Sequence, residues 1–394
     1  MQSIVRSFLY ATVAGALLSP AILAAQATVT PAAKDSAAKS PAPAVPAIDF
    51  SGILFANFQY RGEKGPAHAS NKFDVERAYL TFRMPAGDRT SIRVTADLFQ
   101  QTSPGSDSFY RGWVLRAKYA YLQYNYLNGT DWKGLARVGL LHTVFIDHDE
   151  QFWPRWISTT PTERAGYFSS ADAGVATTIS LPRKFGEVYA TVTNGPGYTS
   201  RELDRFKDYA ARLTVTPWAA EPDNLLKPVA LSAWYYRGAV ASKFVAATPG
   251  EVGPIGSGLD RNRWGVHAAE NDPRLTVGLQ YARRQEQGEA GLNTVGSPRS
   301  VTDSTGNLWS GYAVARPLAF ADKASTSPLS LVFRFDRVTT NTDKGAKYNV
   351  VIGGLIWDLS KRASVSADYQ ETTPVSGAPV APVKTYFAHF VARF

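Results

Sequence analysis

The feature that most constrains this 394-residue chain is a two-residue alternation of apolar and polar side chains, which recurs from Ile48 to the C-terminus. Ile92 and Val94, for example, alternate with Arg93 and Thr95. Successive side chains of a β-strand point to opposite faces, so this period indicates strands with one apolar and one polar face. Beyond residue 48 no stretch is long and apolar enough to cross a bilayer as a helix. The sequence therefore predicts an all-β protein.

Sixteen such segments follow one another, beginning near residues 48, 71, 89, 111, 134, 171, 184, 206, 228, 260, 273, 305, 327, 346, 361 and 384. Several even-numbered connections are tight, as at residues 85–88 and 271–272, although those near 219–227 and 317–326 are longer. The long connections are odd-numbered: residues 146–170, 195–205, 240–259 and 286–304. This asymmetry is typical of transmembrane antiparallel β-barrels with short periplasmic turns and longer extracellular loops. We predict a barrel of about 16 strands, with 14 or 18 as alternatives.

Aromatic residues support a membrane location for this barrel. Several lie toward the ends of the expected strands, where they would form a girdle at the lipid interface: Trp113, Tyr126, Trp132, Trp218, Trp264, Trp309 and Trp357. The last strand alternates up to Phe394, the final residue. An ending of this kind resembles the signal by which bacterial outer-membrane proteins are recognised for insertion. It implies the barrel-assembly machinery as a partner, with outer-membrane lipid and lipopolysaccharide around the barrel.

The first 47 residues differ from the rest. Residues 1–27 combine Arg6, an uncharged stretch and a small-residue site at Ala25 to Ala27, which predicts a signal peptide that is cleaved on export; a permanent membrane anchor is the alternative. Residues 28–47 are rich in Ala and Pro and predict a flexible linker or a tether to the cell wall. The barrel would then occupy residues 48–394, in the bacterial cell outer membrane.

Composition argues against several other classes of function. There is no cysteine, which excludes disulfides, thiol nucleophiles and iron–sulfur clusters. His142 precedes an acidic segment at 147–150 that could hold a cation or orient a base, but a solvated loop explains it more simply. No Gly-x-Ser-x-Gly or His-Glu-x-x-His motif occurs. The formal charge is +9, yet the basic residues form no run, which argues against nucleic acid. We predict neither an enzyme nor a requirement for a cofactor or metal.

A barrel of about 16 strands is too wide for side chains to fill, so it encloses an aqueous channel unless a plug enters. The longest connection, residues 146–170, is a candidate constriction loop that folds into this channel; the alternative is that it lies over the mouth. Its charged side chains are Asp147, Asp149, Glu150, Arg155, Glu163 and Arg164.

Alternation also assigns charges to the channel. If the apolar side of each strand faces lipid, the pore-lining candidates are Arg77, Arg83, Arg93, Arg137, Arg212, Arg274 and Arg334, against Asp97, Asp336 and Asp368. Rows of guanidinium groups lower the electrostatic barrier to small anions. Because the acids of the candidate loop outnumber its arginines, a general or weakly cation-selective channel is the alternative to a mild preference for anions.

Four segments then show a family resemblance: residues 73–82, 118–124, 137–139 and 192–195. The first contains Arg77-Ala78-Tyr79-Leu80 after an alternating start, and the others follow in the same order. Together they resemble the phosphate-selective porin O and P family. The resemblance implies an outer-membrane porin for small hydrophilic solutes, often a homotrimer and often preferring anions such as phosphate. The competing classes are an outer-membrane β-barrel enzyme and a secreted β-rich adhesin.

Overall fold

The computed structural model describes residues 47–62, 71–100, 112–241, 258–290, 300–321, 327–377 and 380–394. The predicted signal peptide at 1–27 lies outside the described residues, as does the predicted linker at 28–47 apart from its last residue. Sixteen strands make up the described part: β1 (Asp49–Arg61), β2 (Asn71–Gly87), β3 (Thr90–Gln100), β4 (Trp113–Asn128), β5 (Lys133–His142), β6 (Ala171–Ser180), β7 (Gly186–Thr193), β8 (Asp208–Val215), β9 (Val229–Ala241), β10 (Gly258–Asn271), β11 (Leu275–Ala290), β12 (Ser300–Ala315), β13 (Leu329–Asn341), β14 (Ala346–Ser360), β15 (Ala363–Ser376) and β16 (Val383–Arg393).

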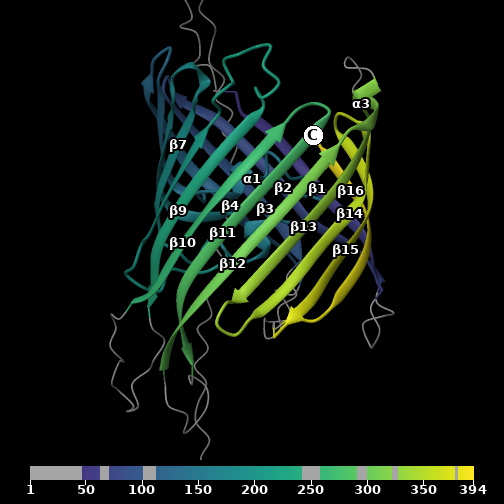
Figure 1. The fold of residues 1–394 in the computed structure, drawn as a ribbon. Helices are drawn as coiled ribbons and strands as arrows, with labels where there is room; N and C mark the ends of the chain where they lie inside the picture. Colours follow the sequence, from purple (N-terminus) through teal and green to yellow (C-terminus); the bar gives the residue numbers. More distant parts are fainter. Residues whose placement is uncertain are drawn as a thin grey trace, which may run out of the picture. The chain divides into compact units, whose positions relative to one another are not determined.

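These strands form one closed antiparallel barrel in which every strand pairs with its neighbours in the chain (Figure 1). β1 and β16 close the barrel, with Ile53 opposite Arg393. Two backbone hydrogen bonds extend this seam: Gly52 N donates to Phe394 O at 2.8 Å, and Phe394 N donates to Gly52 O at 3.0 Å. The predicted sixteen-stranded antiparallel barrel is confirmed.

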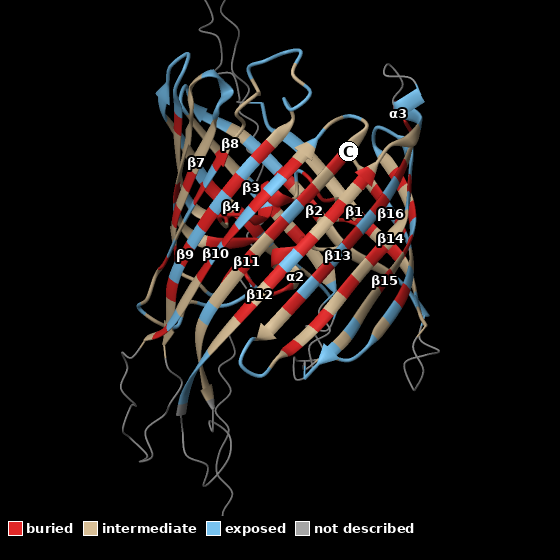
Figure 2. Ribbon diagram, in the orientation of Figure 1, coloured by how far each residue is buried: buried red, intermediate tan, exposed pale blue. Residues whose placement is uncertain are grey.

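The outer wall is apolar and the inner wall carries most of the polar side chains, which inverts the pattern of a soluble protein. In β9, Leu231 and Tyr235 are exposed on the outside, whereas Ser232 and Trp234 are buried inside. Figure 2 shows this alternation as bands of buried and exposed residues along the strands. Such a wall is stable where its outer face meets hydrocarbon and its inner face meets water or other polar groups.

The connections divide the barrel into two ends. The even-numbered connections lie at the end where β1 begins and β16 finishes, which we call the turn end; the odd-numbered ones lie at the opposite loop end. The predicted contrast in length has one clear exception, because the β13–β14 connection at the loop end contains only residues 342–345. In addition, β11 and β12 run farther than expected, so their connection shrinks to residues 291–299.

Four short helical segments occur in the described parts of the connections. α1 (Ile146–Asp149) and α2 (Pro161–Arg164) belong to the long β5–β6 connection, a 3-10 helix spans Pro182–Lys184, and α3 (Pro317–Ala321) lies at the turn end. Among the described residues, none of the helices has the length and apolar character needed to span a membrane.

Candidate functional site

The β5–β6 connection, residues 143–170, lies against the inner wall of the barrel. Phe145, Ile146 and Trp153 have no exposed surface, and Tyr167 has almost none. Trp153 packs beside Tyr312 of β12 at 5.6 Å between ring centroids, and Arg334 of β13 lies over its ring at 5.2 Å. The large apolar side chains of this loop are therefore covered by lumenal residues, and α2 is visible inside the barrel in Figure 2.

Polar side chains of the wall bind backbone carbonyls of the loop. Arg212 Nη1 donates to Val144 O at 2.8 Å, Gln370 Nε2 donates to Ile157 O at 2.8 Å, and Arg334 Nη1 donates to Thr159 O at 2.6 Å. Loops carry backbone groups that would be costly to bury unpaired. The three hydrogen bonds give the carbonyl groups of Val144, Ile157 and Thr159 a partner. They also hold the loop against strands β8 to β15.

The acidic segment of the loop is partly buried, contrary to the expectation of a solvated cluster. Tyr312 OH donates to Asp149 Oδ1 at 3.1 Å, and Gln280 Nε2 donates to Asp149 Oδ2 at 3.3 Å. His148 Nε2 lies 2.9 Å from Ser232 Oγ. Burial raises the pKa of Asp149 to about 7, and the two hydrogen bonds limit the rise. These polar contacts attach α1 to the wall, so His148 and Asp149 serve packing; within the described ranges, no three His, Cys, Asp or Glu side chains form a metal site.

The other face of the loop carries an ion cluster centred on Arg155. Its Nη1 atom lies 2.6 Å from Glu150 Oε1, and its Nη2 atom lies 2.9 Å from Glu163 Oε1. Burial by itself would lower the pKa of Arg155, but Glu163 and Glu150 outweigh burial and hold that pKa well above its usual range. One cation thus offsets part of the charge of two acids. Asp147, by contrast, is half exposed and lies 3.3 Å from His142 Nε2.

A cationic wall is formed by the inner faces of β2 to β5. Its centre is Asp97 of β3, which has no exposed side-chain surface and binds two arginines. Arg77 Nη1 and Arg116 Nη2 each lie 3.0 Å from Asp97 Oδ2, and both guanidinium groups keep about a quarter of their surface exposed. Because one carboxylate serves two guanidinium groups, this part of the wall keeps a positive excess.

Three further cations of this wall have neutral neighbours. Arg93 lies over the Tyr119 ring at 4.6 Å, Lys118 lies 4.2 Å from the Tyr79 ring centroid, and Arg137 Nε donates to Gln123 Oε1 at 3.0 Å. No carboxylate lies within 4.0 Å of these three cations among the residues that the structure describes. Arg83 is paired in register with Arg93 and lies 3.7 Å from Asp49, near the turn end.

The seven arginines expected to line a pore therefore separate into three groups. Arg77, Arg83, Arg93 and Arg137 lie together on the cationic wall. Arg212 and Arg334 also point inward, where the β5–β6 loop covers them; Arg334 has no exposed surface and binds Asp336 at 2.6 Å. Arg274 precedes β11 in a tight turn, where its Nε donates to Asp272 at 2.8 Å.

The candidate loop residues also separate. Glu150 and Arg155 form the ion cluster, and Asp147 is exposed on the same loop. Asp149 is buried against β11 and β12. Arg164 points at β15, where its Nη2 atom donates to Thr372 Oγ1 at 3.1 Å.

Two cations of the wall were missed by the sequence analysis, Arg116 and Lys118 of β4. Opposite Thr95 and Ala96 the β3–β4 register shifts by one residue, so Lys118 and Tyr119 are both buried. Reading a strict alternation through this bulge assigns Lys118 to the lipid side. The only signal in the sequence was the break in alternation itself.

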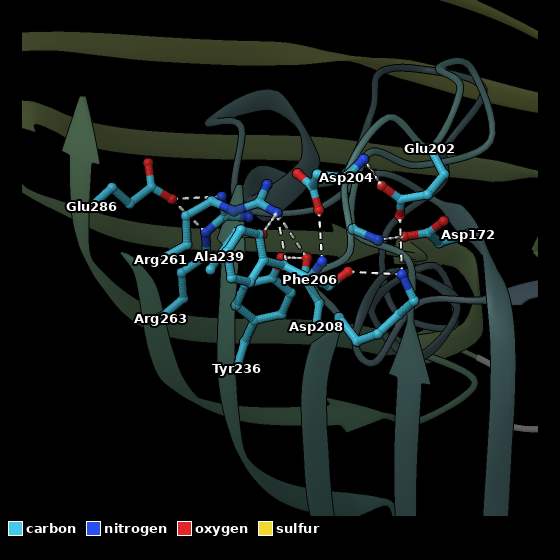
Figure 3. Close-up of polar contacts among 12 residues, drawn as sticks. Asp172, Glu202, Asp204, Phe206, Asp208, Tyr236, Ala239, Arg261, Arg263 and Glu286 are labelled. Carbon is cyan, nitrogen blue, oxygen red and sulfur yellow. Dashed lines mark hydrogen bonds and ion pairs between the residues drawn. The ribbon is translucent and has the colours of Figure 1, made fainter. Parts of the chain in front are cut away.

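A second polar network lies toward the loop end of β8 to β11 (Figure 3). Asp208 accepts hydrogen bonds from Tyr236 OH and, at 3.1 Å, from Arg261 Nη2. Arg263 Nε donates to Glu286 Oε1 at 2.6 Å, and Asp172 accepts from Gly195 N at 2.6 Å. These arginines are paired with acids, so this network holds the β7–β8 connection in place and adds little positive charge to the lumen.

Comparisons with solved structures identify the fold. OmpT of Vibrio cholerae, an outer-membrane protein solved in a trimer form, is 12% identical, with 89% of this chain and 99% of that chain covered at a TM-score of 0.55. OmpF of Salmonella typhi is 13% identical, with 88% of this chain and 97% of that chain covered at a TM-score of 0.55. A structure described as porin is 11% identical, with 88% of this chain and 100% of that chain covered at a TM-score of 0.52.

This chain has the fold of outer-membrane porins. No protein-family model matches the sequence, and no curated protein matches it. The resemblance to the phosphate-selective porin O and P family therefore stays a prediction.

Proposed function

We propose that this protein is an outer-membrane porin: a passive, water-filled channel for small hydrophilic solutes, with a mild preference for anions such as phosphate. The observation that carries the anion preference is the asymmetry of the lumen. The cationic wall of β2 to β5 has more cations than carboxylates, whereas the β5–β6 loop neutralises part of its acidic charge with Arg155. Small anions entering such a lumen would meet a lower electrostatic barrier than cations.

The preference is mild because acids remain within reach. Asp147 is exposed, and Asp74 on β2 is paired with Lys72. Ion pairs of this kind leave little net field, and salt screens what remains over about 10 Å. A general or weakly cation-selective porin is the second candidate, and the exposed carboxylate of Asp147 is the observation that favours it.

The outer wall supports the membrane location. Its exposed aromatic side chains include Trp113, Trp264, Trp309 and Trp357, as expected of an interfacial girdle. We infer export with cleavage of residues 1–27, insertion by the barrel-assembly machinery through the strand that ends at Phe394, and assembly as a homotrimer. We propose a channel and not an enzyme.

Two measurements test the proposal. Liposomes containing the refolded protein should swell in isotonic solutions of small uncharged sugars, and the rate should fall as sugar size increases; no swelling from heat-modifiable, folded protein would contradict a channel. In planar bilayers under a KCl gradient, the double variant Arg93→Gln/Arg137→Gln should reduce the ratio of anion to cation permeability, by about two- to threefold for partly screened charges. The matched control Arg183→Gln/Arg362→Gln removes two exposed charges from connections at the turn end and should leave this ratio unchanged.

A further inference from the structure

We propose that the outer wall of β9 to β14 binds lipopolysaccharide, through a collar of outward-facing basic residues at the loop end. This inference rests on the proposed function, because it needs the barrel to sit in an outer membrane with the loop end outside. It adds a binding site on the face opposite to the lumen.

The collar consists of three arginines and three asparagines that alternate from strand to strand. In register, Arg237 of β9 pairs with Asn262 of β10. Arg283 of β11 pairs with Asn307 of β12. Arg337 of β13 pairs with Asn349 of β14. All six share the parity of the outer wall. Each arginine–asparagine pair is offset by two residues from the next, because Arg283 lies opposite Trp264 and Arg337 lies opposite Trp309. The three pairs therefore form a stepped polar row across six strands.

A row of aromatic residues lies directly beneath the collar. Tyr235, Tyr281 and Trp309 are each two residues nearer the turn end than the collar residue of their strand, and so is Trp264. The Trp264 and Tyr281 ring centroids are 5.4 Å apart, and those of Tyr281 and Trp309 are 4.5 Å apart. Aromatic rows of this kind mark the level of lipid head groups. The arginines just above them therefore lie at the level of head-group phosphates.

The height of the collar agrees with this assignment. On the opposite border of the wall, exposed Trp357 of β14 pairs with Leu329 of β13. Arg337 follows Leu329 by eight residues on the same strand. At about 3.4 Å per residue and a tilt of about 40°, the two levels are roughly 20 Å apart, close to the apolar band of about 25 Å in outer-membrane barrels.

Below the collar, the wall is hollowed into an apolar groove across β8 to β13. Small residues line its middle, among them Ala233, Ala268 and Gly311, while Leu213 and Phe333 border it. A groove of this kind accommodates acyl chains beneath a bound head group. The collar would thus bind the phosphates of a lipid, and the groove beneath it would hold the acyl chains of the same lipid.

The three arginines of the collar form no ion pair with another described residue. Asp260 and Asp303 lie on the loop side of the collar, but no ion pair within 4.0 Å joins them to Arg237, Arg283 or Arg337 among the described residues. The far wall differs: toward the loop end, Tyr60, Phe73 and Trp113 are exposed aromatic residues. Among the described strand residues, the outward-facing arginines toward the loop end thus lie on β9, β11 and β13.

The spacing favours a lipid with several phosphates. Strands lie about 4.8 Å apart, so arginines on alternate strands are roughly 10 Å apart and the collar spans roughly 20 Å. A phospholipid with a single phosphate would contact one arginine at a time. Lipopolysaccharide carries several phosphates on one sugar head group, and it can engage the three arginines together with charge-assisted hydrogen bonds.

The test uses delipidated, refolded full-length protein and purified lipid A, with binding measured by thermophoresis or native mass spectrometry. The triple variant Arg237→Gln/Arg283→Gln/Arg337→Gln should bind phosphorylated lipid A about fivefold more weakly per arginine, or roughly a hundredfold overall. The triple Arg→Lys variant keeps the charge and should retain most of the affinity. The matched control Arg183→Gln/Lys361→Gln/Arg362→Gln removes three exposed charges at the turn end and should bind like the wild type.

Four results would overturn the proposal: wild-type affinity in the triple Gln variant, equal binding of dephosphorylated lipid A, equal binding of phosphatidylglycerol, or a change of oligomeric state that makes the collar a subunit interface. Heat-modified gel migration verifies that each variant is folded. Conductance of the same preparations is read separately. If the wild-type protein binds lipid A but does not conduct, the proposed channel is refuted and the proposed binding site stands. If it conducts but does not bind lipid A, the binding site is refuted and the channel stands.

Discussion

At the scale of single residues, Asp97 determines how much positive charge the cationic wall presents. It is buried and binds both Arg77 and Arg116. Asp97→Asn keeps the shape and part of the hydrogen bonding but frees two guanidinium groups, which are exposed enough to be solvated. We expect the ratio of anion to cation permeability to rise by about two- to threefold, as measured from reversal potentials. An unchanged or lower ratio in folded protein would mean that these arginines do not face the permeation path.

Asp149 makes the attachment of the β5–β6 loop sensitive to pH. Burial raises the pKa of Asp149 from 3.8 to about 7. The folded state therefore binds a proton that the unfolded state has released between about pH 4 and 7, so this residue's contribution to stability falls as pH rises through that window. Asp149→Asn should remove this dependence and should be more stable than wild type at pH 8. Urea unfolding at pH 4 to 8 measures both; a steeper loss of stability in the variant would contradict the assignment.

Where the alternation is regular, the sequence identifies which side of a strand faces inward. Arg77, Arg93 and Arg137 follow strict alternation and lie together on the inner wall. Lys118 was missed because a bulge reverses the alternation within β4. Arg212 and Arg334 were placed on the correct side of their strands, but alternation within a strand carries no information about which loop covers that side.

At the scale of elements, Trp153 is the apolar contact that holds the loop against the wall. It has no exposed surface, and truncation of a buried tryptophan costs about 3–5 kcal/mol. Trp153→Ala should loosen residues 143–170 from the wall and increase single-channel conductance and its fluctuations. Trp309→Ala removes an equally large side chain from the outer wall, where it is 60% exposed, and should leave conductance unchanged. Equal conductance in both variants would show that the loop does not narrow the channel.

The final strand is a second element with a specific expectation. Phe394 pairs with Gly52 through two backbone hydrogen bonds, and its ring lies 5.9 Å from that of Phe50 at the seam. Phe394→Ala should lower the yield of heat-modifiable barrel in membranes, because closure and recognition both involve this residue. Phe390→Ala, on the outer face of the same strand, is the matched control. Equal yields of the two variants would show that Phe394 has no specific role in assembly.

Element boundaries were largely predictable because each strand ends where its alternation does. β2, β6 and β14 begin at the expected residues, whereas β12 begins at Ser300, five residues before the expected start. The difference arises because residues 300–304 are mostly small and polar and show no alternation, although they pair with β11. Hydrogen bonding to a neighbouring strand can extend a strand beyond its pattern.

For the whole molecule, the strand count, closure and antiparallel order followed from the repetition of one pattern. What lies inside the barrel did not follow, because the fate of the β5–β6 loop depends on contacts between residues far apart in the chain, such as Arg334 with Thr159. The fold positions two charged surfaces on opposite sides of the lumen, and the proposed selectivity depends on their balance.

The reversal potential of the wild-type protein in a planar bilayer under a KCl gradient tests the account most directly. The proposed porin should form stable open channels with a small potential of the sign given by anion preference, and the potential should shrink as salt concentration increases. A potential of the opposite sign would contradict the role of the cationic wall. No conductance from demonstrably folded protein would contradict the channel itself.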